Sequence, residues 1–176
     1  MTARRRIGVF GGTFDPIDRG HIDIACAAGA ALGLGRLFVI PASVPPHRAH
    51  PLASSFHRFA MVALSVLERP RWRASDLELR SSGRSFTSAT LEQFHARGYS
   101  SHELFFVVGA DAFVDIGTWK DYPGILDMAH FVVVSRPGCQ VTQLPARHPL
   151  LEPRMVQPPF AESSGGQPSI ILLDVA

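Results

Sequence analysis

Short apolar runs along this chain alternate with longer stretches whose apolar positions recur at helical spacing, a pattern typical of buried strands joined by amphipathic helices. The predicted strands cover residues 7–10, 36–40, 71–79, 103–108, 130–135 and 169–175. The predicted helices cover residues 22–34, 54–68, 86–97, 112–116 and 122–128. Strands that are apolar throughout and alternate with helices predict an α/β fold with a doubly wound, Rossmann-like parallel sheet.

The pattern fails between residues 140 and 168. Half of the 14 prolines lie from Pro137 to Pro168, and residues 163–166 read Ser-Ser-Gly-Gly, which is typical of a turn. We expect a long, mobile surface excursion here. The length of 176 residues suits a single domain, covering residues 1–176, with a core of its own.

Composition narrows the class of protein. The chain is 46% hydrophobic and 18% charged, with a net charge of +2, which suits an anionic small-molecule ligand. No basic stripe with interleaved aromatics predicts nucleic-acid binding, and no apolar run is long enough to cross a membrane. The two cysteines, Cys26 and Cys139, lack paired spacing, so we expect free thiols, Cys26 in the core, and a cytoplasmic protein. Composition carries no signal for an oligomeric state.

The chemistry concentrates in the stretch GGTFDPIDRGH, residues 11–21, between the first predicted strand and helix. Gly11 and Gly12 have no Cβ, so a ligand can approach their backbone closely. The helix that follows offers unpaired N–H groups and the positive end of its dipole. His21 in its first turn adds a side-chain donor. Together these features predict a phosphate site.

Other side chains of this stretch add to the prediction. Thr13 can donate a hydroxyl hydrogen, and Phe14 is expected to pack inward and hold the turn. Asp18 and His21 are three residues apart and share one helix face toward the mouth of the turn. A glycine pair alone is more often an ordinary strand-to-helix connection, but the eleven residues together are more specific.

Later strand ends carry further candidates. Gly109 and Asp111 follow the strand at 103–108, and Arg136 follows the strand at 130–135. Ligands bind at the carboxyl ends of parallel strands, so we expect a cleft where residues 11–21 and 109–111 meet. An ordinary helix N-cap is the alternative role for Asp111, and a surface cation is the alternative for Arg136.

The remaining candidates lie in loops. His47 and Arg48, in a proline-rich loop, could bind a phosphate or carboxylate, with a solvated basic loop as the alternative. Phe86 and Thr87 begin a predicted helix whose N–H groups are exposed. Trp119 could stack on a ring, although an isolated tryptophan is more often a core residue.

These motifs together resemble a known family. The resemblance rests on residues 11–21, 44–48, 85–91, 108–111, 118–119 and 135–138, in that order, and covers roughly residues 7–138. The chain is similar to the nucleotidyltransferase superfamily and, within it, to bacterial nicotinate-nucleotide adenylyltransferases. The resemblance implies the nucleotidyltransferase fold and transfer of the adenylyl group of ATP to nicotinate mononucleotide. The products would be nicotinate adenine dinucleotide and pyrophosphate, in NAD biosynthesis, with Mg²⁺ held mainly by the ATP phosphates.

The resemblance also implies which residues bind the two substrates. ATP would be bound by Gly11, Gly12, Thr13, Phe14, His21, Gly109, Asp111, Ser135 and Arg136. Nicotinate mononucleotide would be bound by His47, Arg48, Phe86, Thr87 and Trp119. The catalytic positions would be His21 and Asp18, where Asp18 stands in place of the first histidine of the family's H-x-G-H motif.

Two departures from the family bear on activity. Asp18 is one, and the absence of the family's late Ser/Thr-rich segment with its arginine is the other, as if the C-terminal end of the family fold were missing. Both are phosphate-handling features, so we expect impaired adenylyl transfer. The alternatives are a non-catalytic nucleotide-binding homologue and the related pantetheine-phosphate adenylyltransferase.

Overall fold

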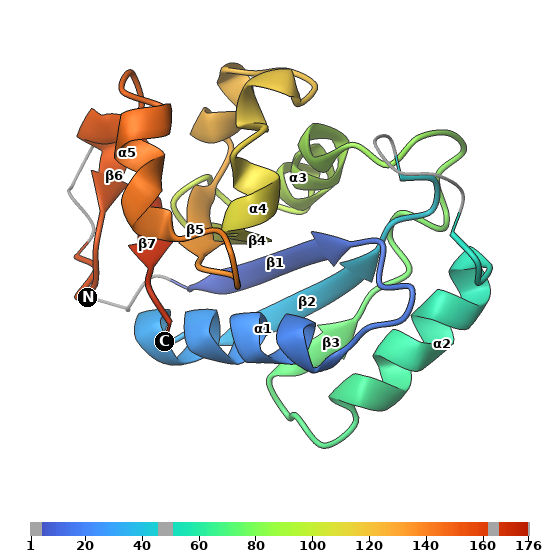
Figure 1. The fold of residues 1–176 in the computed structure, drawn as a ribbon. Coiled ribbons are helices and arrows are strands. Elements are labelled where there is room, and N and C mark those ends of the chain that lie inside the picture. The colour runs from blue at the N-terminus through green and yellow to red at the C-terminus, as the bar shows by residue number, and fades with distance from the viewer. Residues whose placement is uncertain (1–4, 46–50, 162–165, 176) are drawn as a thin grey trace.

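The computed structural model describes residues 5–45, 51–161 and 166–175, whose strands form one seven-stranded sheet (Figure 1). Neighbouring strands run parallel, in the order β3-β2-β1-β4-β5-β7-β6. The strands are β1 (Ile7–Gly12), β2 (Arg36–Pro41), β3 (Trp72–Ala74), β4 (Leu104–Gly109), β5 (His130–Val134), β6 (Met155–Val156) and β7 (Ile170–Leu173). The order reverses between β1 and β4, which makes their carboxyl ends the topological switch point.

Helices cover both faces of the sheet (Figure 1). One face carries α1 (Arg19–Leu32) and α2 (Ser55–Val66). The other carries α3 (Thr87–Ala96), α4 (Ala110–Phe113), α5 (Leu144–Arg147) and the short 3-10 helices η1 (Ile116–Thr118), η2 (Gly124–Asp127), η3 (Val141–Gln143) and η4 (Glu152–Arg154). The predicted doubly wound parallel fold is confirmed.

The core follows from this layering. Because both faces are covered, every residue of β5 is buried, as is every residue of β4 except Gly109. Such burial of apolar surface is the main stabilising contribution, at roughly 25 cal/mol per Å². The prediction that Cys26 belongs to the core is wrong, since it lies on the exposed side of α1. The buried side of that helix is formed by Ile24, Ala25, Ala28 and Leu32.

Element boundaries differ from the predicted ones for local reasons. Helix α1 begins three residues before the predicted start because Asp18 caps it. Helix α2 begins close to its predicted start, since the Ser54 hydroxyl accepts the His57 N–H at 3.3 Å. The predicted strand over residues 71–79 is too long: β3 lies at the sheet edge, and its pairing with β2 ends at Ala74.

The sequence predicted a surface excursion at 140–168, and this prediction is wrong in part. It holds η3, α5, η4 and β6, and its side chains Val141, Leu144 and Leu151 are buried in the core. Strand β6 adds to the sheet beside β7. These elements are two to four residues long, too short to leave a periodic pattern in the sequence. The expected mobility of this segment stays a prediction.

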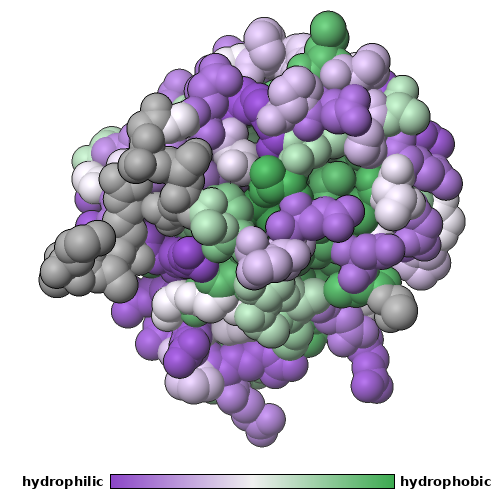
Figure 2. Space-filling model, turned by 90° about the vertical axis from the view of Figure 1, so that its left-hand side faces the viewer, coloured by the Kyte–Doolittle hydropathy of each residue, from purple (hydrophilic) through white to green (hydrophobic). Residues whose placement is uncertain are grey.

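Figure 2 shows the side of the molecule that carries β6 and α5, where apolar side chains gather around a hollow. A recess of about 320 Å³ lies between α1 and β7. Ala27 and Ala31 form its wall on the helix, and Leu172 and Leu173 form its wall on the strand. The small side chains of Ala27 and Ala31 leave room for this recess, while Leu172 and Leu173 are buried, at 5% and 4% exposed.

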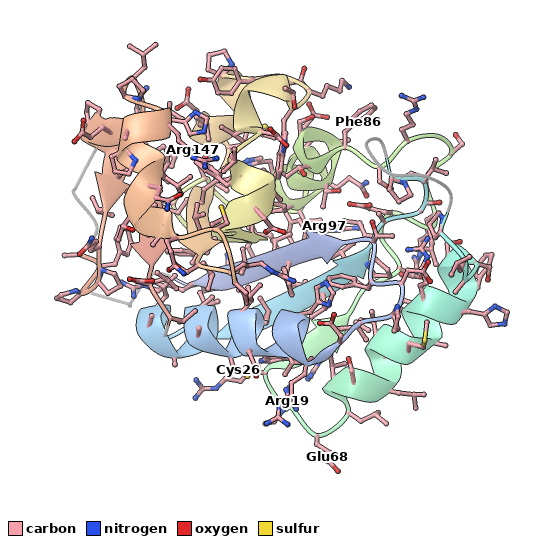
Figure 3. All side chains as sticks on the ribbon, in the orientation of Figure 1. Arg19, Cys26, Glu68, Phe86, Arg97 and Arg147 are labelled. Atoms are coloured by element: carbon pink, nitrogen blue, oxygen red, sulfur yellow. The ribbon has the colours of Figure 1, made fainter. Side chains whose placement is uncertain are left out.

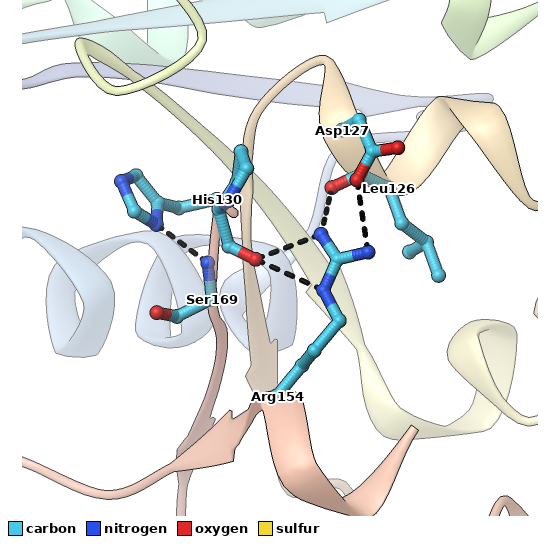
Figure 4. A network of polar contacts seen from close by, with 6 residues as sticks. Leu126, Asp127, His130, Arg154 and Ser169 are labelled. Carbon is cyan, nitrogen blue, oxygen red and sulfur yellow. Dashed lines mark hydrogen bonds and ion pairs between the residues drawn. The ribbon is translucent and has the colours of Figure 1, made fainter. Parts of the chain in front are cut away.

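Arg154 ties the 140–168 segment to the rest of the sheet (Figure 4). Its guanidinium donates to the carbonyl oxygens of Leu126 and Pro168, and its Nη1 lies 3.0 Å from Asp127 Oδ1. One side chain thus joins η4 to η2 and to the start of β7. A planar guanidinium with several donors suits such multiple attachment.

His130 is buried at the beginning of β5, with 2% of its surface exposed. Its Nδ1 accepts the Ser169 N–H at 2.9 Å (Figure 4), and its ring stacks on Phe105 with the centroids 4.8 Å apart. Burial, helped by the positive charges of His102, Arg6 and Arg154, lowers the pKa of His130 from 6.5 to about 4. The neutral imidazole is therefore the form that the fold accepts.

This buried histidine makes stability depend on pH. Between pH 6.5 and about 4, His130 binds a proton in the unfolded chain more readily than in the folded one, so the free energy of unfolding falls as the pH falls. His130→Asn keeps an acceptor for the Ser169 N–H and cannot titrate. We expect the drop in Tm from pH 7 to pH 5, followed by circular dichroism, to be smaller in the variant. Equal drops in both proteins would contradict the assignment.

Candidate functional site

A cavity of about 710 Å³ opens at the carboxyl ends of β1 and β4, at the switch point of the sheet. It brings together most of the side chains that the sequence singled out. Its lining includes Gly11, Gly12, Thr13, Phe14, Asp18, His21, Phe86, Thr87, Gly109, Asp111, Trp119 and Arg136. The expected meeting of residues 11–21 with residues 109–111 is therefore present in the structure.

Among the described residues, one predicted site residue, Ser135, is not part of that lining. Ser135 is 5% exposed, and its hydroxyl donates to Asp174 Oδ1 at 2.8 Å and accepts the Val141 N–H at 3.1 Å. These contacts make it a link between the ends of β5 and β7. His47 and Arg48 lie outside the described residues.

The glycines at the end of β1 serve the cavity in two ways. The pairing of β1 with β2 continues to Gly12, whereas its pairing with β4 stops at Phe10. On the side that faces β4, Gly11 and Gly12 are therefore not paired with a strand, and this side borders the cavity. A Cβ on Gly12 would also lie 2.8 Å from the ring of Phe14, so glycine allows that ring to pack.

Phe14 holds the turn, as predicted. It is 2% exposed, although its φ of 49° is unusual for a side chain of this size. Its ring contacts Phe10 and His21 edge-on, with centroids 5.3 Å and 5.2 Å away. Packing of Phe14 thus fixes the backbone of the turn and the ring of His21 together.

A buried arginine that sequence reasoning missed holds the same turn from behind. Arg58, on α2, is 1% exposed. Its guanidinium donates to the carbonyl oxygens of Thr13 at 2.5 Å, Ser43 at 3.1 Å and Ala53 at 3.2 Å. Burial lowers the pKa of Arg58, while the nearby Asp15 carboxylate opposes that shift. The one available signal was a charged residue inside an otherwise uncharged amphipathic helix.

Asp15 completes this attachment. Its carboxylate accepts the N–H groups of Leu52 at 2.6 Å and Ala53 at 3.1 Å. The turn after β1 is therefore bonded to the segment before α2 through Asp15 and through Arg58. These hydrogen bonds join residues that lie 37 to 45 positions apart in the sequence.

Glu78 lines the cavity, and sequence reasoning did not single it out. The Thr90 hydroxyl donates to its Oε1 at 2.6 Å. Burial raises the pKa of Glu78, and hydrogen bonds from Thr90 and Ser85 oppose that shift. Ser85 also accepts the Ser43 N–H at 2.8 Å, which joins the loop before α3 to the loop after β2.

The beginning of α1 is closed by a capping box between Asp18 and His21. The Asp18 carboxylate accepts the His21 N–H at 2.9 Å, and His21 Nδ1 lies 3.1 Å from the Asp18 backbone nitrogen. His21 Nδ1 also lies 2.6 Å from Asp18 Oδ1. The bond from the Asp18 N–H requires Nδ1 to accept, whereas a bond to the carboxylate requires Nδ1 to carry a proton, so only one of the two contacts is a hydrogen bond at a time.

The Asp18 carboxyl group is ionised at neutral pH. The hydrogen bond from the His21 N–H has the largest effect and lowers the pKa of Asp18; burial opposes it, and the interactions with His21 and Arg136 lower the pKa further. A carboxylate therefore stands at the helix N-terminus where the sequence predicted a phosphate site. It occupies one of the N–H groups that an anionic ligand would use.

Asp111 and Arg136 face each other at the end of β4. Arg136 Nε lies 4.0 Å from Asp111 Oδ1. A Cβ on Gly109 would collide with the Asp111 carboxylate and lie 2.7 Å from Arg136 Cδ, so both side chains would have to move to admit it. Asp111 is the second residue of α4, whose N-cap is Gly109, so the alternative of an ordinary N-cap is wrong.

The opposite end of the cavity is aromatic. Phe86 is the N-cap residue of α3 (Figure 3), and no side chain caps that helix. The N–H groups at the start of α3 adjoin the lining residue Thr87. Trp119 packs edge-on against Phe106, with centroids 6.1 Å apart, so it is both partly core and partly lining.

This sequence is similar to those of known proteins. The profile of the cytidylyltransferase-like family matches residues 9–165. The chain is 40% identical over 148 residues to a probable nicotinate-nucleotide adenylyltransferase of Geotalea uraniireducens, a match that covers 82% of this chain and 67% of the relative. It is 42% identical over 134 residues to the protein of the same name from Geotalea daltonii, covering 76% and 62%. The chain thus spans about two thirds or less of these relatives, and the resemblance to such enzymes is confirmed.

A solved structure shares the fold. The Plasmodium falciparum nicotinic acid mononucleotide adenylyltransferase complexed with NaAD aligns with a TM-score of 0.66, over 81% of this chain and 71% of that one. The sequence identity is 18%, so this likeness concerns the fold alone.

The Arg58 attachment leads to a stability prediction. Arg58→Met leaves three carbonyl oxygens without their donor, so we expect the free energy of unfolding to fall by about 2–4 kcal/mol. The matched control is Arg80→Met, because Arg80 is exposed and pairs with Asp76. Its cost should stay below about 1 kcal/mol. Urea unfolding measures both, and equal stability of the two variants would overturn the role given to Arg58.

Proposed function

Because the chain belongs to the cytidylyltransferase-like family, we propose that it transfers the adenylyl group of ATP to nicotinate mononucleotide. The products are nicotinate adenine dinucleotide and pyrophosphate, in NAD biosynthesis. One observation carries the proposal: a single cavity at the switch point collects the glycine turn, the start of α1, the end of β4 and the aromatic end at α3. Its volume of about 710 Å³ lies within the range of small-molecule sites.

We place ATP at the end formed by β1, α1 and β4. The backbone of Gly11 and Gly12, the start of α1 and His21 supply donors for phosphate oxygens. The Asp111 carboxylate suits the two hydroxyls of a ribose, because it accepts hydrogen bonds and donates none. Arg136 supplies a cation close to the phosphate path.

We place nicotinate mononucleotide at the aromatic end. Trp119 offers a ring face for stacking, and the uncapped start of α3 at Phe86 and Thr87 offers N–H groups to an anionic group. The two substrates then meet near His21, between the glycine turn and α1.

The reaction requires alignment more than a base. A phosphate oxygen of nicotinate mononucleotide forms a bond to the α-phosphorus of ATP, and the bond to the bridging oxygen breaks with release of pyrophosphate. The attacking phosphate is already an anion. His21 and the N–H groups of the turn would therefore act by holding two anions in line and stabilising the charge between them.

We propose Mg²⁺ as the cofactor. Among the described residues no group of three or more His, Cys, Asp or Glu side chains is placed to hold a metal ion. The ion would therefore come with ATP and be held mainly by its phosphates, where it neutralises their charge. Asp15, Asp18, Asp111 and Asp115 are the aspartates among the described residues that line the cavity.

The two cysteines are free thiols, which fits the reducing cytoplasm where we place this reaction. No helix among the described residues has the length and apolar character that a membrane crossing needs.

We further propose that Asp18 impairs this activity. Two unit charges of like sign about 4 Å apart repel by roughly 4 kcal/mol at an effective dielectric constant of about 20. That corresponds to about a thousandfold in binding or rate. The capping box adds to the effect because the Asp18 carboxylate occupies the His21 N–H. The same observation favours a second candidate, a non-catalytic nucleotide-binding protein.

Release of pyrophosphate from ATP, Mg²⁺ and nicotinate mononucleotide tests the main proposal. We expect slow release by the chain and a loss of at least a hundredfold in His21→Ala, because a donor to the transition state is removed. ATP binding measured by calorimetry without any pyrophosphate release would favour the non-catalytic candidate. The absence of both would overturn the nucleotide site.

Substitution of Asp18 tests the impairment. Asp18→His restores a donor, and we expect kcat/KM to rise at least tenfold in the pyrophosphate assay. Asp18→Ala carries neither a charge nor a donor, so it separates repulsion from the missing donor. A gain in both variants indicates repulsion, and a gain in Asp18→His alone indicates the donor. If neither variant gains turnover, Asp18 does not impair the reaction.

A further inference from the structure

Helix α2 has an apolar face on the side turned away from the sheet. Among the described residues, four of the eight large apolar side chains that are exposed lie on this helix or next to it. Phe56, Leu64 and Leu67 are 73%, 68% and 74% exposed, and Leu52, just before the helix, is fully exposed. Ala60, between Phe56 and Leu64, is exposed as well.

The pattern along α2 is that of a helix covered on two sides. Positions 56, 60, 64 and 67 are spaced by four, four and three residues, which places them on one side of a helix. The buried positions 58, 62 and 66 form the other side. Arg58 is the only lysine, arginine, aspartate or glutamate of the helix and is 1% exposed. A surface helix without a charged outer side indicates that this side has a partner.

The charges at the two ends of α2 oppose its own dipole. Glu68 follows the C-cap residue Leu67, at the negative end, and no acidic residue lies in the first turn, at the positive end. Arg69 is turned toward the Trp72 ring, with its guanidinium carbon 5.0 Å from the ring centroid. Glu68 projects away from the body of the molecule (Figure 3). A second α2 of opposite direction would bring its positive end beside Glu68.

We propose that the partner is a second copy of this chain, whose α2 packs antiparallel on the first about a two-fold axis. With the axis between Ala60 and Leu64, Ala60 of each copy faces the partner's Leu64, and Phe56 faces the partner's Leu67. The outer face of α2 is thus complementary to itself. In a two-fold interface every such contact occurs twice.

The polar groups that flank this face complement each other in the same arrangement. His57 is exposed, and its Nδ1 lies 3.0 Å from Ser54 Oγ, which leaves Nε2 to contact the partner's Glu68. A carboxylate accepts a hydrogen bond from an imidazole N–H whether the ring is neutral or charged. The two antiparallel helix dipoles attract each other as well.

The size of the face sets the strength of the dimer. A standard interface removes about 800 Å² from each partner, and one side of a helix about 18 Å long supplies less. We therefore expect a weak dimer, with a dissociation constant on the order of 100 μM. Helix α2 lies at the edge of the molecule beside β3 (Figure 1). None of the four outer-face residues lines the cavity, so the second copy leaves it open.

A lipid surface is the other partner that an apolar helix face could bind. Helices that lie on membranes carry lysine and arginine on their polar side. Helix α2 has no exposed lysine or arginine, so its composition favours a protein surface of the same kind.

Sedimentation equilibrium of the full chain tests the dimer. Between about 10 μM and about 1 mM we expect the weight-average mass to rise toward twice the monomer mass. Leu64→Glu places two carboxylates in each interface, so its dissociation constant should rise at least tenfold. The matched control is Leu150→Glu, because Leu150 is 90% exposed and lies between α5 and η4, away from α2. Its dissociation constant should stay within twofold.

Three results would overturn the proposal. The first is a monomer at every concentration, and the second is an equal effect of the two glutamate variants. The third is a chain that stays monomeric and floats with vesicles of phosphatidylcholine and phosphatidylglycerol, which would assign the face to a lipid surface.

A charge exchange tests the antiparallel geometry. Glu68→Arg puts a cation against the partner's His57 and the positive end of its helix, so we expect the dissociation constant to rise at least fivefold. The double variant His57→Glu, Glu68→Arg restores opposite charges at both contacts and should return to within threefold of the original value. If the double variant dimerises no better than Glu68→Arg, the two residues do not meet and the proposed packing is wrong.

Discussion

The buried guanidinium of Arg58 is the interaction on which the shape of the site depends. It donates to backbone oxygens of three separate segments, the turn after β1, the loop after β2 and the residue before the N-cap of α2. A turn that displays its N–H groups to a ligand cannot spend them on its own folding, so it must be held through its carbonyl oxygens. Arg58 does this from the side away from the cavity, and Asp15 binds the same neighbouring segment with its carboxylate.

At the start of α1, stability and function compete for the same atoms. An aspartate N-cap stabilises a helix by accepting a backbone N–H and by placing negative charge at the positive end of the dipole. A phosphate ligand would use the same donor and the same field. In this chain the Asp18 carboxylate already accepts the His21 N–H and lies against the His21 ring. The capping box is thus favourable to the helix and unfavourable to an anion.

The two ends of the cavity are built from the same elements in different proportions. Each has one cation, one or more carboxylates and the start of a helix, but the end at β1, α1 and β4 adds glycines and the opposite end adds aromatic side chains. Glycine admits a phosphate chain close to the backbone. Aromatic rings offer an apolar face to a base or pyridine ring. The two ends of the cavity therefore differ in the side chains that line them and in the ligand groups that they suit.

Much of this arrangement was predictable from local sequence. Apolar runs and helical periodicity located the main strands and helices, and the alternation of the two fixed the doubly wound class. That class in turn brings the ends of β1 and β4 together, which is why Gly11–His21 and Gly109–Asp111 could be assigned to one cleft. Long-range polar pairing was not predictable. The partners of Arg58, Glu78 and Ser135 lie up to 45 residues away, and a buried charge is accepted only where the fold supplies those partners. The short elements of 140–168 were hidden for the same reason, since their place is set by Arg154 and by packing on β7 rather than by any period in their own sequence.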